Sequence, residues 1–157
     1  MEKIIYKEVK DKEEKKKITR QILEQLKDWF EVDEPREEYI KNSENLPLIA
    51  AFEDDNPIGF ICLKETGKET LEISVIGVLK EYHRNGIGKE LFNLAKKYAI
   101  DNKYEYIQVK TVKMGVYPEY DQTNNFYKSL GFKELEVFPN YWDELNPCQI
   151  YIIYVGR

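Results

Sequence analysis

Two glycines with the spacing Gly-x-Gly lie between a strand-like apolar run and a helix-like pattern. The apolar run covers 71–78, and after Gly86 and Gly88 apolar residues recur at helical spacing over 87–99. A helix that begins on glycines offers free backbone N–H groups and the positive end of its dipole, and an anion can approach glycine closely. We therefore expect an anion site here, with phosphate as the usual anion, and Arg84 and Lys89 add positive charge.

The glycine spacing disfavours two common phosphate-binding motifs. A dinucleotide fingerprint requires a third glycine where Leu91 stands. A P-loop requires Gly at position 83 and Ser or Thr at position 90, but these positions are His83 and Glu90. The remaining pattern over 78–89 is Val-x-x-x-Tyr-x-Arg-x-Gly-x-Gly-Lys. It resembles the acyl-CoA loop of the Gcn5-related N-acetyltransferase (GNAT) family, whose signature is Gln/Arg-x-x-Gly-x-Gly/Ala.

This resemblance implies acetyl-CoA as a co-substrate. The signature begins with His83, where Gln or Arg is more usual, and we expect His83 to contact the loop or the diphosphate rather than to act in catalysis. The resemblance also implies that backbone groups at the end of the preceding strand pair with the pantetheine arm and the thioester carbonyl. The implied cofactor-binding residues are Ile76, Val78, His83, Arg84, Asn85, Gly86, Ile87, Gly88 and Lys89. Gly77 indicates either a strand bulge or relief of crowding.

A second segment resembles the same family, with Tyr127 followed by three residues and then Gly131-Phe132. In the family this tyrosine commonly lies near the CoA sulfur, so the resemblance gives Tyr127 the role of general acid. Attack of an amine on a thioester forms a tetrahedral oxyanion and expels a thiolate, which a phenol with a pKa of about 10 can protonate. The competing interpretation is that Tyr127 only packs against its neighbours, because the chain contains 12 tyrosines and most of them must be packing residues.

Glu72 is our first candidate for the general base that takes a proton from the amine. Alternation along its strand places Glu72 on the face opposite the apolar residues. Other candidates, all in predicted loops and all compatible with ordinary surface carboxylates, are Asp33, Glu34 and Glu119.

Two further features concern the ligands. The family often places an Asn before the tyrosine, where it contacts CoA; Tyr120 or Asp121 falls near that position, while Asn124 and Asn125 come closer to Tyr127. The predicted loops 117–120 and 141–144 mix aromatic and acidic residues, which suits either an organic cation or core packing.

The hydrophobic pattern predicts one α/β domain over residues 1–157, with the order β-α-α-β-β-β-α-β-α-β-β. Expected strands are 4–9, 46–52, 58–63, 70–78, 106–112, 132–138 and 149–155. Expected helices are 12–30 with Asp11 as its cap, 36–42, one from 87 to a stop at 101–103, and 123–130. We expect an antiparallel meander followed by a parallel crossover. This is the order of the GNAT fold, a mixed, splayed central sheet of about seven strands with four helices.

The composition of the chain indicates which classes of partner it binds and in which cellular compartment it works. A net charge of −5 disfavours nucleic acid and is compatible with a cationic small-molecule amine. Without an 18-residue apolar run or a signal-peptide segment, we expect no membrane partner and a cytoplasmic location. Two distant cysteines and one histidine predict no metal site. A homodimer through the aromatic-rich C-terminal strand is compatible with the sequence.

We therefore expect an acetyl-CoA-dependent N-acetyltransferase that transfers the acetyl group directly to a primary amine of a small molecule. A protein N-terminus or lysine is the alternative acceptor within the same class. A catalytically idle acyl-CoA-binding module is the alternative from a different class, and it would need Gly86 and Gly88 but not Tyr127.

Overall fold

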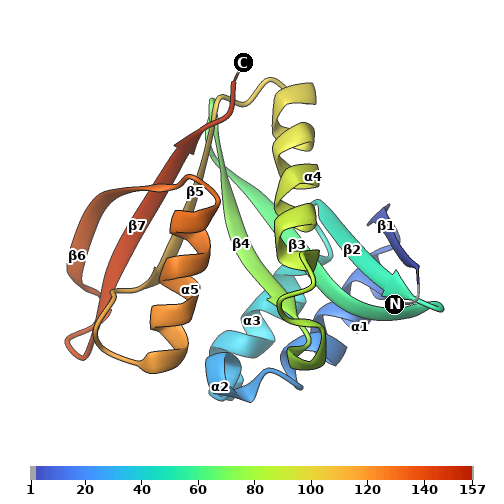
Figure 1. Ribbon diagram of the computed structural model, residues 1–157, viewed down its shortest axis with the longest axis horizontal. Coiled ribbons are helices and arrows are strands. Elements are labelled where there is room, and N and C mark those ends of the chain that lie inside the picture. Colours follow the sequence, from blue (N-terminus) through green and yellow to red (C-terminus); the bar gives the residue numbers. More distant parts are fainter. Residues whose placement is uncertain (1–2, 157) are drawn as a thin grey trace. The chain divides into compact units, whose positions relative to one another are not determined.

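The computed structural model describes residues 3–156, which form one mixed seven-stranded sheet with helices (Figure 1). The hydrogen-bonded strand order is β1-β2-β3-β4-β5-β7-β6. The strands are β1 Ile4–Val9, β2 Leu48–Glu53, β3 Asn56–Gly67, β4 Thr70–Val78, β5 Tyr106–Val112, β6 Lys133–Asp143 and β7 Asn146–Tyr154. The helices are α1 Lys12–Leu23, α2 Lys27–Phe30, α3 Asp33–Ser43, α4 Ile87–Asp101 and α5 Pro118–Ser129, with a 3-10 turn at Lys80–Tyr82. The predicted GNAT-like fold class is confirmed.

The chain forms two compact units, one made of the residues up to 64 with 73–98 and the other of 65–72 with those from 99 onward. In the first unit β2 pairs antiparallel with β3, as the predicted meander of 46–52, 58–63 and 70–78 requires, and β1 pairs antiparallel with β2. Asp11 caps α1 by accepting a hydrogen bond from the Glu14 backbone N–H at 2.9 Å. The single-domain organisation over 1–157 stays a prediction.

The first helix ends earlier than the periodicity indicates. We expected one helix over 12–30, but α1 ends at Leu23 and the short α2 begins at Lys27. Leu26 nevertheless stays buried, because a tight turn, closed by a 3.1 Å bond from Leu26 N to Leu23 O, keeps it on the apolar side. The next helix, α3, begins at Asp33 rather than 36, since Pro35 in a first turn removes no helical hydrogen bond.

In the second unit the start of β4 pairs in parallel with β5, which confirms the predicted crossover. This parallel ladder joins Thr70–Glu72 to Tyr106–Gln108 and ends there. Antiparallel pairing then joins β5 to β7 and β7 to β6. Helix α5 lies beside these strands (Figure 1).

Two predicted loops of the second unit are regular structure. The segment that we expected to be a loop before position 123 contains the first turn of α5, because Pro118 fits the first helical position. The predicted loop 139–147 is a β-hairpin in which β6 continues to Asp143 and β7 begins at Asn146. Pro139 is tolerated within β6 because β6 is an edge strand, where a missing N–H need not break a ladder.

Candidate functional site

The N-terminus of α4 has the geometry of an anion site. Gly86 has a φ of +76°, and no atom lies within 4 Å of the position that a Cβ would take there. Its carbonyl accepts the first helical bond, from Glu90 N at 3.0 Å. The next three backbone N–H groups lack a helical acceptor by the geometry of a helix start; they belong to Ile87, Gly88 and Lys89. The free donors and the open space beside Gly86 fit a diphosphate.

The loop before this helix is tightly curved. Arg84 also has a positive φ, +67°, a conformation that costs a non-glycine residue about 1–2 kcal/mol. Such strain persists only where the surroundings hold the backbone in place.

Contacts within the first unit supply that support. Lys80 forms an ion pair with Asp28, and its ammonium lies 5.6 Å from the centre of the Trp29 ring. The Tyr82 hydroxyl donates a hydrogen bond to Glu53, and this bond raises the pKa of Tyr82. The loop is thus tied both to α2 and to the end of β2.

His83 binds its own loop. Its Nε2 lies 2.7 Å from the carbonyl oxygen of Val78, so Nε2 carries a hydrogen and donates it. The imidazole also makes an edge contact with Trp29 at 6.1 Å between ring centres. The neighbouring Asn85 donates to the Tyr82 carbonyl at 3.2 Å. These bonds position the loop, while diphosphate contacts by His83 and Asn85 stay predictions.

The remaining predicted cofactor residues differ in how deeply they are buried. Ile87 is buried in the core with 1% of its surface exposed, whereas Ile76 and Val78 are half-buried at the end of β4. A Cβ on Gly77 would lie 3.0 Å from Leu26 Cδ1, so glycine there allows the chain after α1 to pack closely on β4.

In the second unit, Glu72 is buried and paired. Its Oε1 accepts a hydrogen bond from Lys110 Nζ at 2.6 Å, and the side chains are 8% and 19% exposed. The Lys110 ammonium also lies 5.7 Å from the centre of the Tyr141 ring. Tyr141 belongs to the segment 141–144, which we considered as a site for an organic cation. The cation beside its ring is the protein's own lysine.

Sequence reasoning missed Lys110. Alternation along β5 places it on the same face as Gln108, which is the register partner of Glu72. A lysine within a strand in the interior of the sheet is unusual, since lysine is almost never buried unless it is paired. That signal, together with the parallel register, could have identified the pair.

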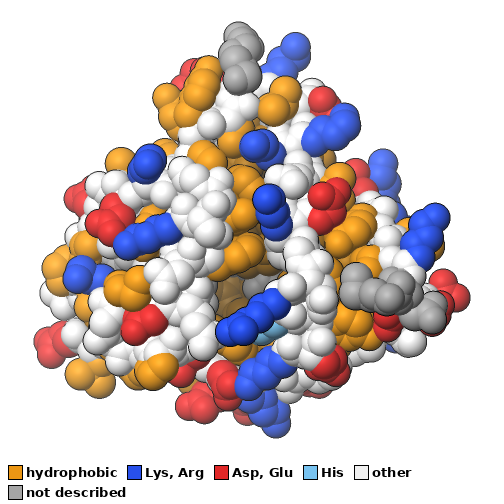
Figure 2. All heavy atoms as spheres, in the orientation of Figure 1, with side chains coloured by type: hydrophobic (Ala, Val, Ile, Leu, Met, Phe, Trp, Pro, Cys, Tyr) orange, Lys and Arg blue, Asp and Glu red, His pale blue; other side chains and the backbone are white. Residues whose placement is uncertain are grey.

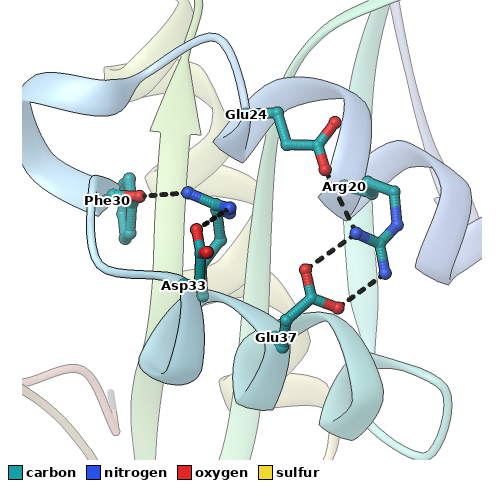
Figure 3. Close-up of polar contacts among 6 residues, drawn as sticks. Arg20, Glu24, Phe30, Asp33 and Glu37 are labelled. Atoms are coloured by element: carbon teal, nitrogen blue, oxygen red, sulfur yellow. Dashed lines mark hydrogen bonds and ion pairs between the residues drawn. The ribbon is translucent and has the colours of Figure 1, made fainter.

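The other carboxylate candidates lie in helices, not in the loops we expected. Asp33 and Glu34 form the first turn of α3, and Glu119 lies in the first turn of α5. Asp33 is held by Arg36 at 2.5 Å, and Arg36 also donates to the Phe30 carbonyl at 2.9 Å (Figure 3). Asp33 is thus engaged in closing the turn between α2 and α3.

A second ion-pair cluster links α1 to α3. Arg20 binds both carboxylate oxygens of Glu37, at 2.7 and 2.8 Å, and binds Glu24 at 3.1 Å (Figure 3). Hydrogen bonding to Arg20 lowers the pKa of Glu37. By joining the helices on either side of α2, these contacts help to position Asp28 and Trp29 against the loop.

Tyr127 is buried, with 4% of its surface exposed. Its ring packs against Phe126 at 5.6 Å, Phe132 at 5.7 Å and Tyr151 at 6.1 Å between centres. Tyr127 therefore has a packing role, and its role as a general acid stays a prediction.

Asn124 is a structural residue of the same unit. It is fully buried; its amide donates to the carbonyls of Val112 at 2.9 Å and Tyr120 at 2.6 Å, and its oxygen accepts from the Tyr151 hydroxyl at 2.6 Å. Burial raises the pKa of Tyr151, so the hydroxyl stays a donor. This full engagement disfavours Asn124 as a CoA contact. Asp121 accepts from the Gly115 N–H at 2.7 Å.

Three further observations bear on the class of ligand. Within residues 3–156 no three His, Cys, Asp or Glu side chains cluster as a metal site would require. In the same described range no helix has both the length and the apolar character needed to cross a membrane. Figure 2 shows basic and acidic side chains interspersed over one face of the molecule.

Comparison with known proteins shows a family relationship. Residues 9–132 match the sequence profile described as the Acetyltransferase (GNAT) family. N-alpha-acetyltransferase 50 of Danio rerio is 24% identical over 111 residues, which are 66% of this chain and 61% of that protein. The chain thus spans about three fifths of the length of this curated relative.

Two solved structures share the fold. A GNAT-family protein from Desulfovibrio desulfuricans superposes with a TM-score of 0.85 at 15% identity, covering 98% of this chain and 100% of its own. An aminoglycoside 6'-N-acetyltransferase complexed with coenzyme A gives a TM-score of 0.78 at 20% identity, covering 98% of both chains.

Proposed function

Because this chain belongs to the GNAT acetyltransferase family, we propose that it transfers an acetyl group from acetyl-CoA directly to a primary amine of a small molecule. The observation that carries the proposal is the start of α4, where Gly86 leaves open space beside free backbone donors. A structural neighbour with this fold is complexed with coenzyme A, which supports the choice of ligand.

In this proposal different residues of the chain bind the cofactor, take a proton from the amine and donate a proton to the leaving group. Acetyl-CoA, when bound, supplies an acetyl thioester whose thiolate the amine replaces. The N–H groups at the start of α4, with Arg84 and Lys89, bind the diphosphate. Glu72 takes a proton from the amine on Oε2, since Lys110 holds Oε1. Tyr127 donates its phenolic proton to the departing sulfur.

A second acceptor class has support of its own. The curated relative from Danio rerio is named as an N-alpha-acetyltransferase, so a protein or peptide N-terminus is the alternative acceptor. The aminoglycoside 6'-N-acetyltransferase is named for a small-molecule acceptor, but at 20% identity its likeness to this chain shows only the fold.

The test is a transfer assay with purified protein, acetyl-CoA and two panels of acceptors. One panel contains small primary amines and the other contains short peptides with free N-termini. We expect amine-dependent release of CoA thiol, with acetylated product detected by mass spectrometry, from the small-amine panel. Product from peptides alone would favour the second class. Binding of CoA without product from either panel would favour an idle acyl-CoA-binding module.

A further inference from the structure

We propose that Glu72 and Lys110 together recognise an acceptor that carries a carboxylate beside its amine, as a free amino acid does. In this arrangement Lys110 binds the carboxylate of the acceptor and Glu72 faces its amine. The inference rests on the proposed function, because it names the substrate class of the same site.

The first argument is the unused hydrogen-bonding capacity of Lys110. An ammonium group has three N–H donors. Lys110 gives one of them to Glu72 Oε1 at 2.6 Å, and among residues 3–156 no other carbonyl, carboxylate or hydroxyl accepts from it. Two donors remain, and the side chain is 19% exposed rather than sealed in the core. A ligand carboxylate would satisfy them with charge-assisted hydrogen bonds.

The second argument is charge complementarity. The two opposite charges of the pair are 2.6 Å apart, and Glu72 Oε2 makes no hydrogen bond within the described part of the chain. In a free amino acid the ammonium and the carboxylate are joined through a single carbon, so they lie at a comparable separation. Such a zwitterion can set its ammonium against Glu72 and its carboxylate against Lys110. A plain cationic amine would gain only the first contact and would be repelled by Lys110.

The third argument is the apolar setting of the pair. Cys148, on the neighbouring strand β7, is completely buried, and its burial raises the pKa of its thiol to about 11. Lys110 and Glu72 are close enough to Cys148 to influence that pKa in opposite directions. Tyr141 adds a ring to the surroundings of Lys110. Polar contacts made in such surroundings are stronger than in water, so they discriminate better between ligands.

Stability alone is a weak explanation for this pair. Replacing a buried ion pair by apolar residues of similar volume is often neutral or stabilising. Glu72 occupies the last register position of the β4–β5 ladder, opposite Gln108, and Lys110 lies two residues further along β5.

The experiment compares acceptors that differ only by a carboxylate. Tyrosine with tyramine, and histidine with histamine, are matched pairs that share the side chain and differ by replacement of the α-carboxylate with hydrogen. We expect kcat/KM for the amino acid to exceed that for the decarboxylated amine by about tenfold or more, the effect of one or two charged hydrogen bonds. Calorimetric titration of the same compounds into CoA-saturated protein should show the same order without turnover.

Three variants assign the effect to Lys110. Lys110→Met should reduce the ratio between amino acid and amine to about one, mainly through KM, whereas Lys110→Arg should retain part of it. Lys113→Met is the matched control, because Lys113 is exposed just beyond β5 and the charge change is identical. The ratio is measured within one preparation, so partial unfolding of a variant cancels.

The outcomes separate this inference from the proposed function. Equal or faster turnover of the decarboxylated amines, turnover of peptides alone, or an unchanged ratio in Lys110→Met overturns the inference and leaves acetyl transfer intact. Failure to bind acetyl-CoA and to acetylate any amine removes the proposed function, and the inference with it.

Discussion

The loop over 80–89 and the face that carries Glu72 and Lys110 are built in different ways. The loop is a backbone site, whose donors are consecutive N–H groups and whose shape depends on positive φ at Arg84 and Gly86. The face is a side-chain site, in which the two charged partners are 38 residues apart. A backbone site suits a ligand that is constant across a family, whereas a side-chain site can be changed one residue at a time.

Tyr127→Phe should produce the largest effect and separates chemistry from cofactor binding. If the phenol is the general acid, kcat should fall by about a hundredfold or more while CoA affinity changes little. Tyr154→Phe, an exposed tyrosine on β7, is the matched control. Turnover equal to that of the wild type would leave Tyr127 with its packing role alone.

Tyr151→Phe tests whether the second unit depends on its buried hydrogen bonds. The substitution leaves the oxygen of fully buried Asn124 without its donor, which should lower the free energy of unfolding by about 1–3 kcal/mol. Urea unfolding measures the loss. A stable variant with weakened CoA binding would instead make Asn124 part of the cofactor site.

Gly86→Ala tests the backbone site. A side chain at a φ of +76° adds about 1–2 kcal/mol of strain, which the free loop can relieve by leaving this conformation but must take on again to bind, so CoA should bind roughly 5–30-fold more weakly in calorimetric titrations. Gly67→Ala is the control, since a Cβ at Gly67 would meet its nearest atoms at 3.9 Å. Equal CoA affinity for the Gly86 and Gly67 variants would contradict a diphosphate site at this loop.

Alkaline pH should produce a smaller, general loss of stability. Burial raises the thiol pKa to about 12 for Cys62 and about 11 for Cys148, above an ordinary value of 9.0. Above pH 9 the unfolded chain therefore releases thiol protons that the folded chain retains, so the free energy of unfolding falls as pH rises. Thermal melts between pH 8 and pH 10.5 measure the decline, and Cys148→Ser should reduce it. A flat profile would contradict the buried state of these thiols.

Local patterns predicted most of the fold. β1, β4 and β5 have the predicted bounds, because each is bordered by a clear change of pattern and contains no proline. The errors lie where tertiary contacts override local signals. Leu26 continues a helical period although α1 has ended, and Pro139 lies within an edge strand that local rules assign to a loop.

The same distinction between local patterns and tertiary contacts explains which residues of the candidate site could be predicted. The Gly-x-Gly spacing located the start of α4 because a helix N-terminus is a local structure. Lys110 was not recognised, since its importance comes from the register of β5 against β4. The roles of His83 in bonding Val78 and of Asn124 in bonding Tyr151 likewise depend on three-dimensional contacts.

The most direct test of the central claim is an amide NMR titration of the protein with CoA. The claim is that the backbone N–H groups at the start of α4 bind the diphosphate. The amide signals of Gly86, Ile87, Gly88 and Lys89 should show the largest downfield shifts at saturation, as expected for new charge-assisted hydrogen bonds. Saturable binding that leaves these four signals in place would contradict the claim.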